Sequence, residues 1–521
     1  MRIRSSLLKR ILCIVAFGVG LLPLQAQKLI TYEAGMGTRD PENADVWILY
    51  KRVRAEHEGM VLHADSALLN TVHNDFTAYG RIRIEITDTT TIFGDRLFYD
   101  GNSRVVDIWA DTVRLVDGKT VLKTNHLSYD RNTATATYNN WGRTVNEDKC
   151  LVSRIGHYNS ETKKVFIYVG VVLNDSNMRM ETDTLIYDMN SHVADFWSPT
   201  HIYTDSAVMY SELGSYNTDL QYAHSVKSSQ VRNGEKVLTC DTLHYYEATE
   251  FGRAIGHVVL EDTVNDITCM GRYGETDQAH HTSFVTDSAL VIFVSRDVSG
   301  DSLRRRPVVP DTLYLHADSV LVRNDSARRF VSVMAHHHVK VFRRDAQAMC
   351  DSAFYSVPDS LLQMYYNPVL WYEGYQCAAD TIEILHNAAG VHRAYLRTNC
   401  FNVEQLDAEK YNQIKGRNGI VYFTAEGEPD YADVIGNAEM VYYITEDDEA
   451  GRTYLVGVNV GIGSDMRIYF KDRAPARVVT MGKPDMRTYP YDQLEPEKRQ
   501  LSNFRWLEER RPHSPQDVFR W

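Results

Sequence analysis

Apolar and polar residues alternate along most of this chain with a period of two. The clearest stretch is Arg81–Ile86, where three isoleucines alternate with charged residues. This pattern is typical of a β-strand with one buried face and one face in water. Short clusters of Gly, Asn and Asp, such as Asp100–Asn102 and Asp117–Lys119, separate these stretches and supply the positive φ angles that tight hairpins need. We therefore predict an all-β, antiparallel fold in which consecutive strands are joined by hairpins.

A phrase of the type Asp-x-Leu-x-Tyr returns about every thirty residues. A fixed period of this size is typical of repeat proteins, whose units stack because none can bury its apolar face alone. Two strands in each period, joined by hairpins, are expected to add one layer, so the ~30-residue repeats predict a solenoid. The phrase is found at Asp95–Tyr99, Asn125–Tyr129, Asp183–Tyr187, Asp241–Tyr245 and Asp351–Tyr355, with shorter echoes from Asp65, Asp318 and Asp380.

The recurring Asp has two interpretations. A calcium-binding solenoid would need glycine-rich nonapeptides, which the sequence lacks. We therefore expect a short polar side chain at a corner, accepting hydrogen bonds from backbone amides as the chain enters a strand.

The first 26 residues have the composition of a secretory signal peptide. Basic residues between Arg2 and Arg10 precede the apolar stretch Ile11–Leu22, and Leu24–Ala26 offers a cleavage site before Gln27. The alternative, a membrane anchor, is disfavoured because an apolar core of about twelve residues is too short to span a bilayer. We therefore expect an exported mature protein.

The net charge of −13 argues against a nucleic-acid partner, because no basic stripe is present to neutralise phosphates. Export makes disulfides chemically accessible to the cysteines that follow the signal peptide. Two pairs, Cys240 with Cys269 and Cys350 with Cys377, are separated by about one repeat. Either these pairs form disulfides or the cysteines are small buried hydrophobic residues. The six cysteines concerned are Cys150, Cys240, Cys269, Cys350, Cys377 and Cys400.

Two segments depart from the alternating pattern. Residues 295–310 carry Arg304–Arg306 and end in proline, which predicts an exposed loop that is either solvated or in contact with a phosphorylated glycolipid. His336–His338 raises the question of a metal, but only two of these side chains could share one face of a strand and no ligand cluster completes the site. Because no nucleophile elbow, phosphate loop or zinc signature is found, we predict no catalytic residues, no metal and no cofactor.

Several repeats lead from the Asp phrase into a second phrase of the type Ala-x-Gly-x-Val-x-Leu. His63–Asp65 leads into Ala78–Ile84, and Cys240–Leu243 leads into Ala254–Leu260. Together with the expected export, these phrases resemble the organic-solvent-tolerance (OstA-like) family, the periplasmic bridge proteins of lipopolysaccharide transport. Tyr411–Arg417, followed by the stretch 433–439, resembles the long members found in Bacteroidetes-type bacteria.

The resemblance implies a β-jellyroll or β-taco solenoid, in which two facing sheets enclose an apolar groove for acyl chains. It divides the chain into a signal peptide (1–26), OstA-like repeats in two or three successive modules (27–490) and a charged, irregular tail (491–521). For every groove residue, plain packing in a closed core is the alternative. The groove candidates are Ile82, Ile84, Ile86, Leu97, Tyr99, Ile108, Val113, Leu115, Leu127, Tyr129, Ile167, Val169, Leu185 and Tyr187.

The resemblance implies a non-enzymatic periplasmic protein that binds the acyl chains of lipopolysaccharide and helps to move it to the outer membrane. An exported structural or adhesive solenoid with a dry core is the alternative, and hairpin turns disfavour a carbohydrate-acting parallel β-helix enzyme. A solenoid leaves unpaired edge strands at its ends. We expect other transport proteins, or a second copy end to end, to dock near Trp47–Val53 and Val441–Ile444.

Overall fold

The computed structural model describes residues 29–295, 311–372, 374–387, 390–447 and 453–521. The expected signal peptide and nearly all of the expected basic loop lie outside this range. Within it, no helix has the length and apolar character needed to cross a bilayer. The chain forms two compact units, one of Met1–Glu147 with Arg154–Thr162 and the other of Asp148–Ser153 with Lys163–Trp521. We call them unit 1 and unit 2 and describe each by itself.

Unit 1 consists of antiparallel strands in which each long strand pairs with the next along the chain. The strands are β1 (Thr31–Glu33), β2 (Met36–Arg39), β3 (Val46–His57), β4 (Met60–Asn70), β5 (Asp75–Glu85), β6 (Thr90–Asp100), β7 (Val105–Asp117), β8 (Thr120–Asp130), β9 (Thr135–Tyr138), β10 (Gly142–Asn146) and β12 (Ile155–Asn159).

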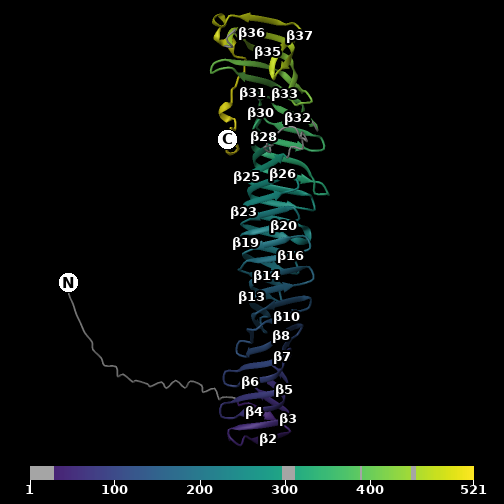
Figure 1. The fold of residues 1–521 in the computed structure, drawn as a ribbon, viewed down its shortest axis with the longest axis vertical. Coiled ribbons are helices and arrows are strands. Elements are labelled where there is room, and N and C mark those ends of the chain that lie inside the picture. The colour runs from purple at the N-terminus through teal and green to yellow at the C-terminus, as the bar shows by residue number, and fades with distance from the viewer. Residues whose placement is uncertain (1–28, 296–310, 373, 388–389, 448–452) are drawn as a thin grey trace, which may run out of the picture. The chain divides into compact units, whose positions relative to one another are not determined.

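Unit 2 continues the same antiparallel pattern, and its strands follow one another in chain order in Figure 1. From β11 to β25 the strands are β11 (Lys149–Ser153), β13 (Lys164–Asn174), β14 (Met178–Asp188), β15 (Val193–Phe196), β16 (Thr200–Thr204), β17 (Val208–Ser211), β18 (Leu213–Asn217), β19 (Tyr222–Lys227), β20 (Ser229–Asn233), β21 (Lys236–Cys240), β22 (Thr242–Tyr246), β23 (Phe251–Asp262), β24 (Ile267–Asp277) and β25 (Thr282–Ser295). The remaining strands are β26 (Asp311–Asn324), β27 (Phe330–Phe342), β28 (Ala346–Ser356), β29 (Leu361–Tyr365), β30 (Val369–Tyr372), β31 (Tyr375–Ala378), β32 (Thr381–Asn387), β33 (Gly390–Gln405), β34 (Tyr411–Phe423), β35 (Pro429–Asp447), β36 (Thr453–Lys471), β37 (Ala474–Met481) and β38 (Asp485–Tyr489). Five short 3-10 turns accompany them: η1 (Glu247–Thr249), η2 (Tyr491–Gln493), η3 (Pro496–Arg499), η4 (Glu508–Arg510) and η5 (Pro515–Phe519).

Near the middle of the long strands, the register between neighbours shifts at a β-bulge. In β5 the register shifts between Tyr79 and Arg83 relative to β4 and between Tyr79 and Ile82 relative to β6, and Gly80 and Arg81 at the bulge have φ angles of 73° and 38°. A bulge bends a strand and increases its local twist, so every strand has two arms that meet at a corner. Unit 2 repeats this corner, for example with positive φ angles at Gly256 and His257 in β23.

Some strands are interrupted at the corner rather than bent. β21 and β22, which flank Asp241, both pair with the single bent strand β23, one with each of its two arms. β15 and β16 pair in the same way with β14. Long and interrupted strands therefore build one folded sheet in each unit, with an inner face between the two sets of arms.

The folded sheet explains the repeat. In β6 the phrase Asp95–Tyr99 places its Asp at the corner and turns Leu97 and Tyr99 inward, where both are buried. One repeat comprises one bent strand with this phrase and the next bent strand. These two strands hydrogen-bond to each other within the sheet, so each repeat adds two successive strands rather than the single layer that we expected. The predicted all-β antiparallel fold is confirmed.

Several corner Asp residues bond to a side chain rather than to backbone amides, which corrects our expectation for them. Asp65 on β4 lies 2.6 Å from the Arg81 guanidinium on β5, and Asp241 lies 2.7 Å from the His257 ring. The backbone amides of the hairpins are instead satisfied by the Asp that follows the Tyr. Asp100, for example, accepts a hydrogen bond of 2.8 Å from the Asn102 amide. The corner pairs are exposed, so they contribute little to the free energy of unfolding. We infer that their main role is to align neighbouring corners.

The histidine run follows the same rule. His337 and His338 are the positive-φ residues at the corner of β27, and they bond to Asp351 and Asp318 on the two neighbouring strands. Across the described ranges, no group of three His, Cys, Asp or Glu residues is placed to hold a metal ion.

Each of the two segments expected to be free edges is paired on both sides over part of its length. Trp47–Tyr50 of β3 pairs with β2 as well as with β4, and Val441 pairs with both β34 and β36. Short terminal strands cause this difference, since β1 and β2 cover β3 while β37 and β38 cover β36. These four strands, rather than the expected segments, are where the sheet of each unit ends.

We predict that Gly80→Ala destabilises unit 1 more than Gly118→Ala does. Both glycines have positive φ, so either substitution is expected to cost about 1 kcal/mol of backbone strain. A Cβ at residue 80 would also lie 2.6 Å from Asp65 Oδ2, whereas a Cβ at residue 118 would meet open space. Native-state hydrogen exchange of the β4 and β5 amides measures the difference, and equal losses in the two variants would refute the close approach at the corner.

Candidate functional site

Twelve of the fourteen groove candidates are buried on the inner face. In unit 1 these are Ile82, Ile84, Leu97, Tyr99, Ile108, Val113, Leu115, Leu127 and Tyr129, and in unit 2 they are Ile167, Leu185 and Tyr187. Ile86 is half-buried in the hairpin turn after β5. Val169 is 46% exposed, because it is a positive-φ corner residue of β13 and the bulge resets the alternation after Ile167. Its placement on the inner face was therefore wrong.

In unit 1 the chain's own side chains fill the inner face. Ile84, Leu97 and Leu115 are fully buried, and tyrosine hydroxyls reach polar groups at the margin. Tyr99 accepts a hydrogen bond of 3.0 Å from Arg131, and Tyr158 donates one of 2.6 Å to Asp117. Burial raises the pKa of both tyrosines, and the Asp117 carboxylate adds to the rise for Tyr158. This is the packing of a closed core.

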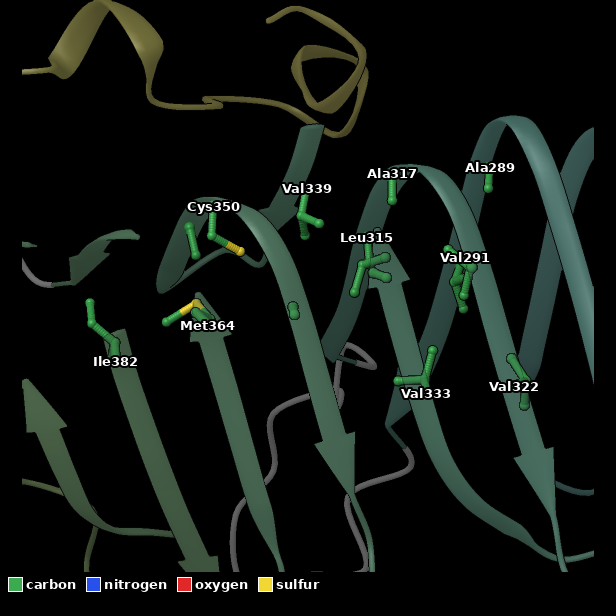
Figure 2. Close-up of a cluster of buried hydrophobic side chains, with 14 of the residues drawn as sticks. Ala289, Val291, Leu315, Ala317, Val322, Val333, Val339, Cys350, Met364 and Ile382 are labelled. Atoms are coloured by element: carbon green, nitrogen blue, oxygen red, sulfur yellow. The ribbon is translucent and has the colours of Figure 1, made fainter. Parts of the chain in front are cut away.

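A core of small residues follows in unit 2. Figure 2 shows part of it, from Ala289 and Val291 on a bent strand to Met364 and Ile382 on two short strands. Valine and alanine predominate, and the members named here are almost completely buried. Ile382 also lines the cavity described next, so the core leads directly into that cavity.

An open cavity of about 470 Å³ lies between the arms of strands β30–β37. This volume is within the range of about 300–1,000 Å³ that is usual for small-molecule sites. Two of these strands, β35 and β36, have 19 residues each, whereas β5 has 11. The floor is apolar and lies near the corners. It includes Cys377, Ile382, Leu396, Val434 and Met440.

One margin of the cavity is a polar row that crosses four neighbouring strands. Tyr375 on β31 pairs with Glu404 on β33, which pairs with Asn412 on β34, and the register places Tyr442 of β35 next. Asn412 donates a hydrogen bond of 2.9 Å to Glu404 and accepts one of 2.8 Å from the Tyr443 amide. We call Tyr375, Glu404, Asn412 and Tyr442 the tyrosine row.

The opposite margin combines apolar residues with the charged side chains of Glu426 and Arg473. It carries Phe423, Pro429, Phe470 and Pro475, which lie at the hairpin ends of the other set of arms. We call these four residues the proline lip. An elongated apolar group with a polar end would therefore contact hydrocarbon on the floor and on the proline lip, and hydrogen-bonding groups along the tyrosine row.

Burial and charge shape the chemistry of this cavity. Burial raises the pKa of Tyr375, and the neighbouring Glu404 carboxylate raises it further; the same two causes act on Tyr442. Burial also raises the pKa of Cys377 to about 12, so this thiol on the cavity floor is protonated near neutral pH. The six cysteines in the described ranges are unbridged, so neither of the two possible disulfide pairs is present.

Residues 29–183 match the family described as OstA-like protein. The chain is similar to the OstA-like family over this segment. The match covers strands of unit 1 and the first strands of unit 2, which is the filled part of the sheet, and the open cavity lies beyond it. The resemblance stated for this part of the chain is confirmed.

No curated protein matches the chain. Among solved structures, the WD40 domain of SCAP from fission yeast is 9% identical and covers 67% of this chain and 87% of its own. Its TM-score of 0.10 is too low to support any argument about fold or function.

Beyond the OstA-like segment, the C-terminal tail covers the outer side of the arm that carries the tyrosine row. Gln376 donates a hydrogen bond of 2.7 Å to the Arg505 carbonyl and accepts one of 2.7 Å from the Leu507 amide. Gln413 holds Arg499 and Leu501 in the same way. The tail returns toward β28, where the mark C lies in Figure 1 and where Gln347 bonds to Arg511.

Tail docking and cavity shape are coupled through adjacent residues. On β31, Gln376 holds the tail while its neighbours Tyr375 and Cys377 line the cavity. Trp371 is fully buried in an outer cluster that includes Leu507 of the tail. The tail therefore backs the wall of the cavity and shields an apolar outer face of the sheet.

Sequence reasoning missed both the cavity and the docking of the tail. The stretches 429–447 and 453–471 contain longer strands than those around Ile84, which is a signal that the arms widen. Gln347, Gln376 and Gln413 are a second signal, because a buried glutamine at an outward position needs a hydrogen-bonding partner.

We predict that Gln376→Ala loosens the tail. The substitution removes both hydrogen bonds that hold the backbone of residues 505–507, at an expected cost of about 1–3 kcal/mol. Faster hydrogen exchange of the Leu507 amide would report the loss. Gln405→Ala is the matched control, because Gln405 is exposed and bonds only to Tyr411. Unchanged protection of Leu507 in Gln376→Ala would show that the tail is held elsewhere.

Proposed function

We propose that this protein is an exported, non-enzymatic carrier that holds acyl chains of lipopolysaccharide in the cavity of unit 2. The observation that carries the proposal is the cavity itself, with an apolar floor, a proline lip and a polar row, in a chain whose N-terminal part is OstA-like. Burial of hydrocarbon supplies the binding energy. At about 0.8 kcal/mol per methylene, ten shielded carbons would contribute roughly 8 kcal/mol before the cost of ordering the chain.

The proposed location is the periplasm, where the protein would help lipopolysaccharide to reach the outer membrane. The basic and apolar composition of residues 1–26 supports export. The sheet ends at β1 and β2 in unit 1 and at β37 and β38 in unit 2, and exposed edge strands can pair with a strand of another chain. Other transport components, or a second copy, would dock there.

A structural or adhesive protein with a dry core is the second candidate. The filled inner face of unit 1, where Ile84 and Leu97 are completely buried, favours it for that part of the chain. For this reason Ile84 is a poor position for a test of lipid loading, since a carboxylate there would disrupt packing first. A substitution at a residue that lines the cavity distinguishes the two candidate functions.

We predict that Val421→Asp abolishes capture of lipopolysaccharide while Ile420→Asp does not. Val421 is half-buried and lines the cavity, whereas Ile420 is its neighbour on β34 and does not line it. A carboxylate in the cavity must be desolvated to admit a chain, so we expect at least about a tenfold loss of affinity. Photocrosslinking to lipopolysaccharide, with circular dichroism to confirm the β structure, measures the outcome.

Ala394→Phe is a second variant that adds no charge. Ala394 lines the cavity, and a phenyl ring at this position would occupy space that the chain needs. We expect the same loss of capture with the fold retained. If folded Val421→Asp and Ala394→Phe proteins both capture lipid as the wild type does, the cavity is not the binding site.

A further inference from the structure

The tyrosine row has a fixed geometry and an uncompensated negative charge. Glu404 is held from one side by Asn412, whose side-chain oxygen is already engaged by the Tyr443 amide. Tyr375 lies beside Glu404 because the two residues pair across β31 and β33, and burial and this carboxylate together raise the pKa of the phenol. A carboxylate can accept about four hydrogen bonds, so Glu404 keeps acceptor capacity beside the cavity.

The nearby cations are committed to other carboxylates. Arg343 on the cavity margin pairs with Asp345 at 2.6 Å, and Arg473 beside the proline lip pairs with Glu428. Lys410, in the hairpin before Asn412, pairs with Asp407. Among the described residues, no lysine or arginine is paired with Glu404. The polar margin therefore offers hydrogen-bond acceptors and a negative charge.

From this arrangement we infer that the tyrosine row selects an alkyl chain whose head is an uncharged, hydroxyl-rich group such as a sugar, and rejects an anionic head. This inference rests on the proposed function, because it concerns the head group of a chain bound in the same cavity. A sugar hydroxyl donates to Glu404 and exchanges hydrogen bonds with the two phenols. A phosphate at the same place would meet the Glu404 charge at a margin of low polarity, where repulsion is poorly screened.

The same geometry sets an orientation. Because the four residues of the proline lip carry no hydrogen-bonding side chain and the adjacent Arg473 is paired with Glu428, the hydroxyl-bearing face of the ligand would turn to the tyrosine row. Anionic substituents of a larger glycolipid would then project from the mouth into solvent rather than lie along this margin.

The test uses probes with one alkyl chain length and different heads: dodecyl glucoside and dodecyl phosphate. Binding to the mature full-length protein is measured by displacement of a fluorescent fatty alcohol. We expect the wild type to bind dodecyl glucoside about tenfold more tightly than dodecyl phosphate. Glu404→Gln keeps the shape and removes the charge, so it should improve binding of the phosphate and bring the two affinities within about threefold. Tyr375→Phe should weaken binding of the glucoside alone.

Glu409→Gln is the control, because it removes one negative charge from the same hairpin region at an exposed position away from the cavity. It should leave the preference unchanged. Equal binding of both probes by the wild type, or an unaltered preference in Glu404→Gln, overturns the inference while the proposed function stands. Failure of every probe to displace the fluorescent alcohol overturns the proposed function itself.

Discussion

The structure depends on the corner in each strand. A flat antiparallel sheet has no interior, and it gains one only if every strand bends at the same place without losing its partners. The bulge meets this requirement by placing two successive residues at positive φ, as at Gly80 and Arg81, so that hydrogen bonding resumes on the far arm. The Asp of the repeated phrase then meets the second of these residues on the next strand, as Asp65 meets Arg81.

Once the sheet is folded, the side chains on its inner face decide whether the interior is filled. In unit 1, with strands of about eleven residues, leucine, isoleucine and tyrosine side chains occupy the space completely. In the last strands of unit 2 the arms are longer, the lining is smaller or only half-buried, and a cavity remains. The tail supports the outer side of this widened region through Gln376 and Gln413. Packing and binding are thus two outcomes of one architecture.

Sequence reasoning succeeded where the physics is local. Alternation in Arg81–Ile86 predicted the strands, and it placed Ile82 and Ile84 on the buried face. It failed at Val169, because the alternation of inward and outward side chains is interrupted at a bulge, and residues at the bulge have positive φ angles. It also failed at the cavity, which arises from the spacing between strands far apart in sequence, such as β31 and β36. The family resemblance is confirmed for residues 29–183. The groove candidates that it suggested in this segment lie mostly on a filled inner face.

The central claim is that the cavity in unit 2 holds lipid. Mass spectrometry of organic extracts from the mature protein, purified from the cell envelope without detergent exchange, tests it most directly. The account predicts acylated glycolipid in the wild-type extract and its loss from folded Ala394→Phe protein. Equal amounts of lipid in both extracts, or none in either, would contradict the account.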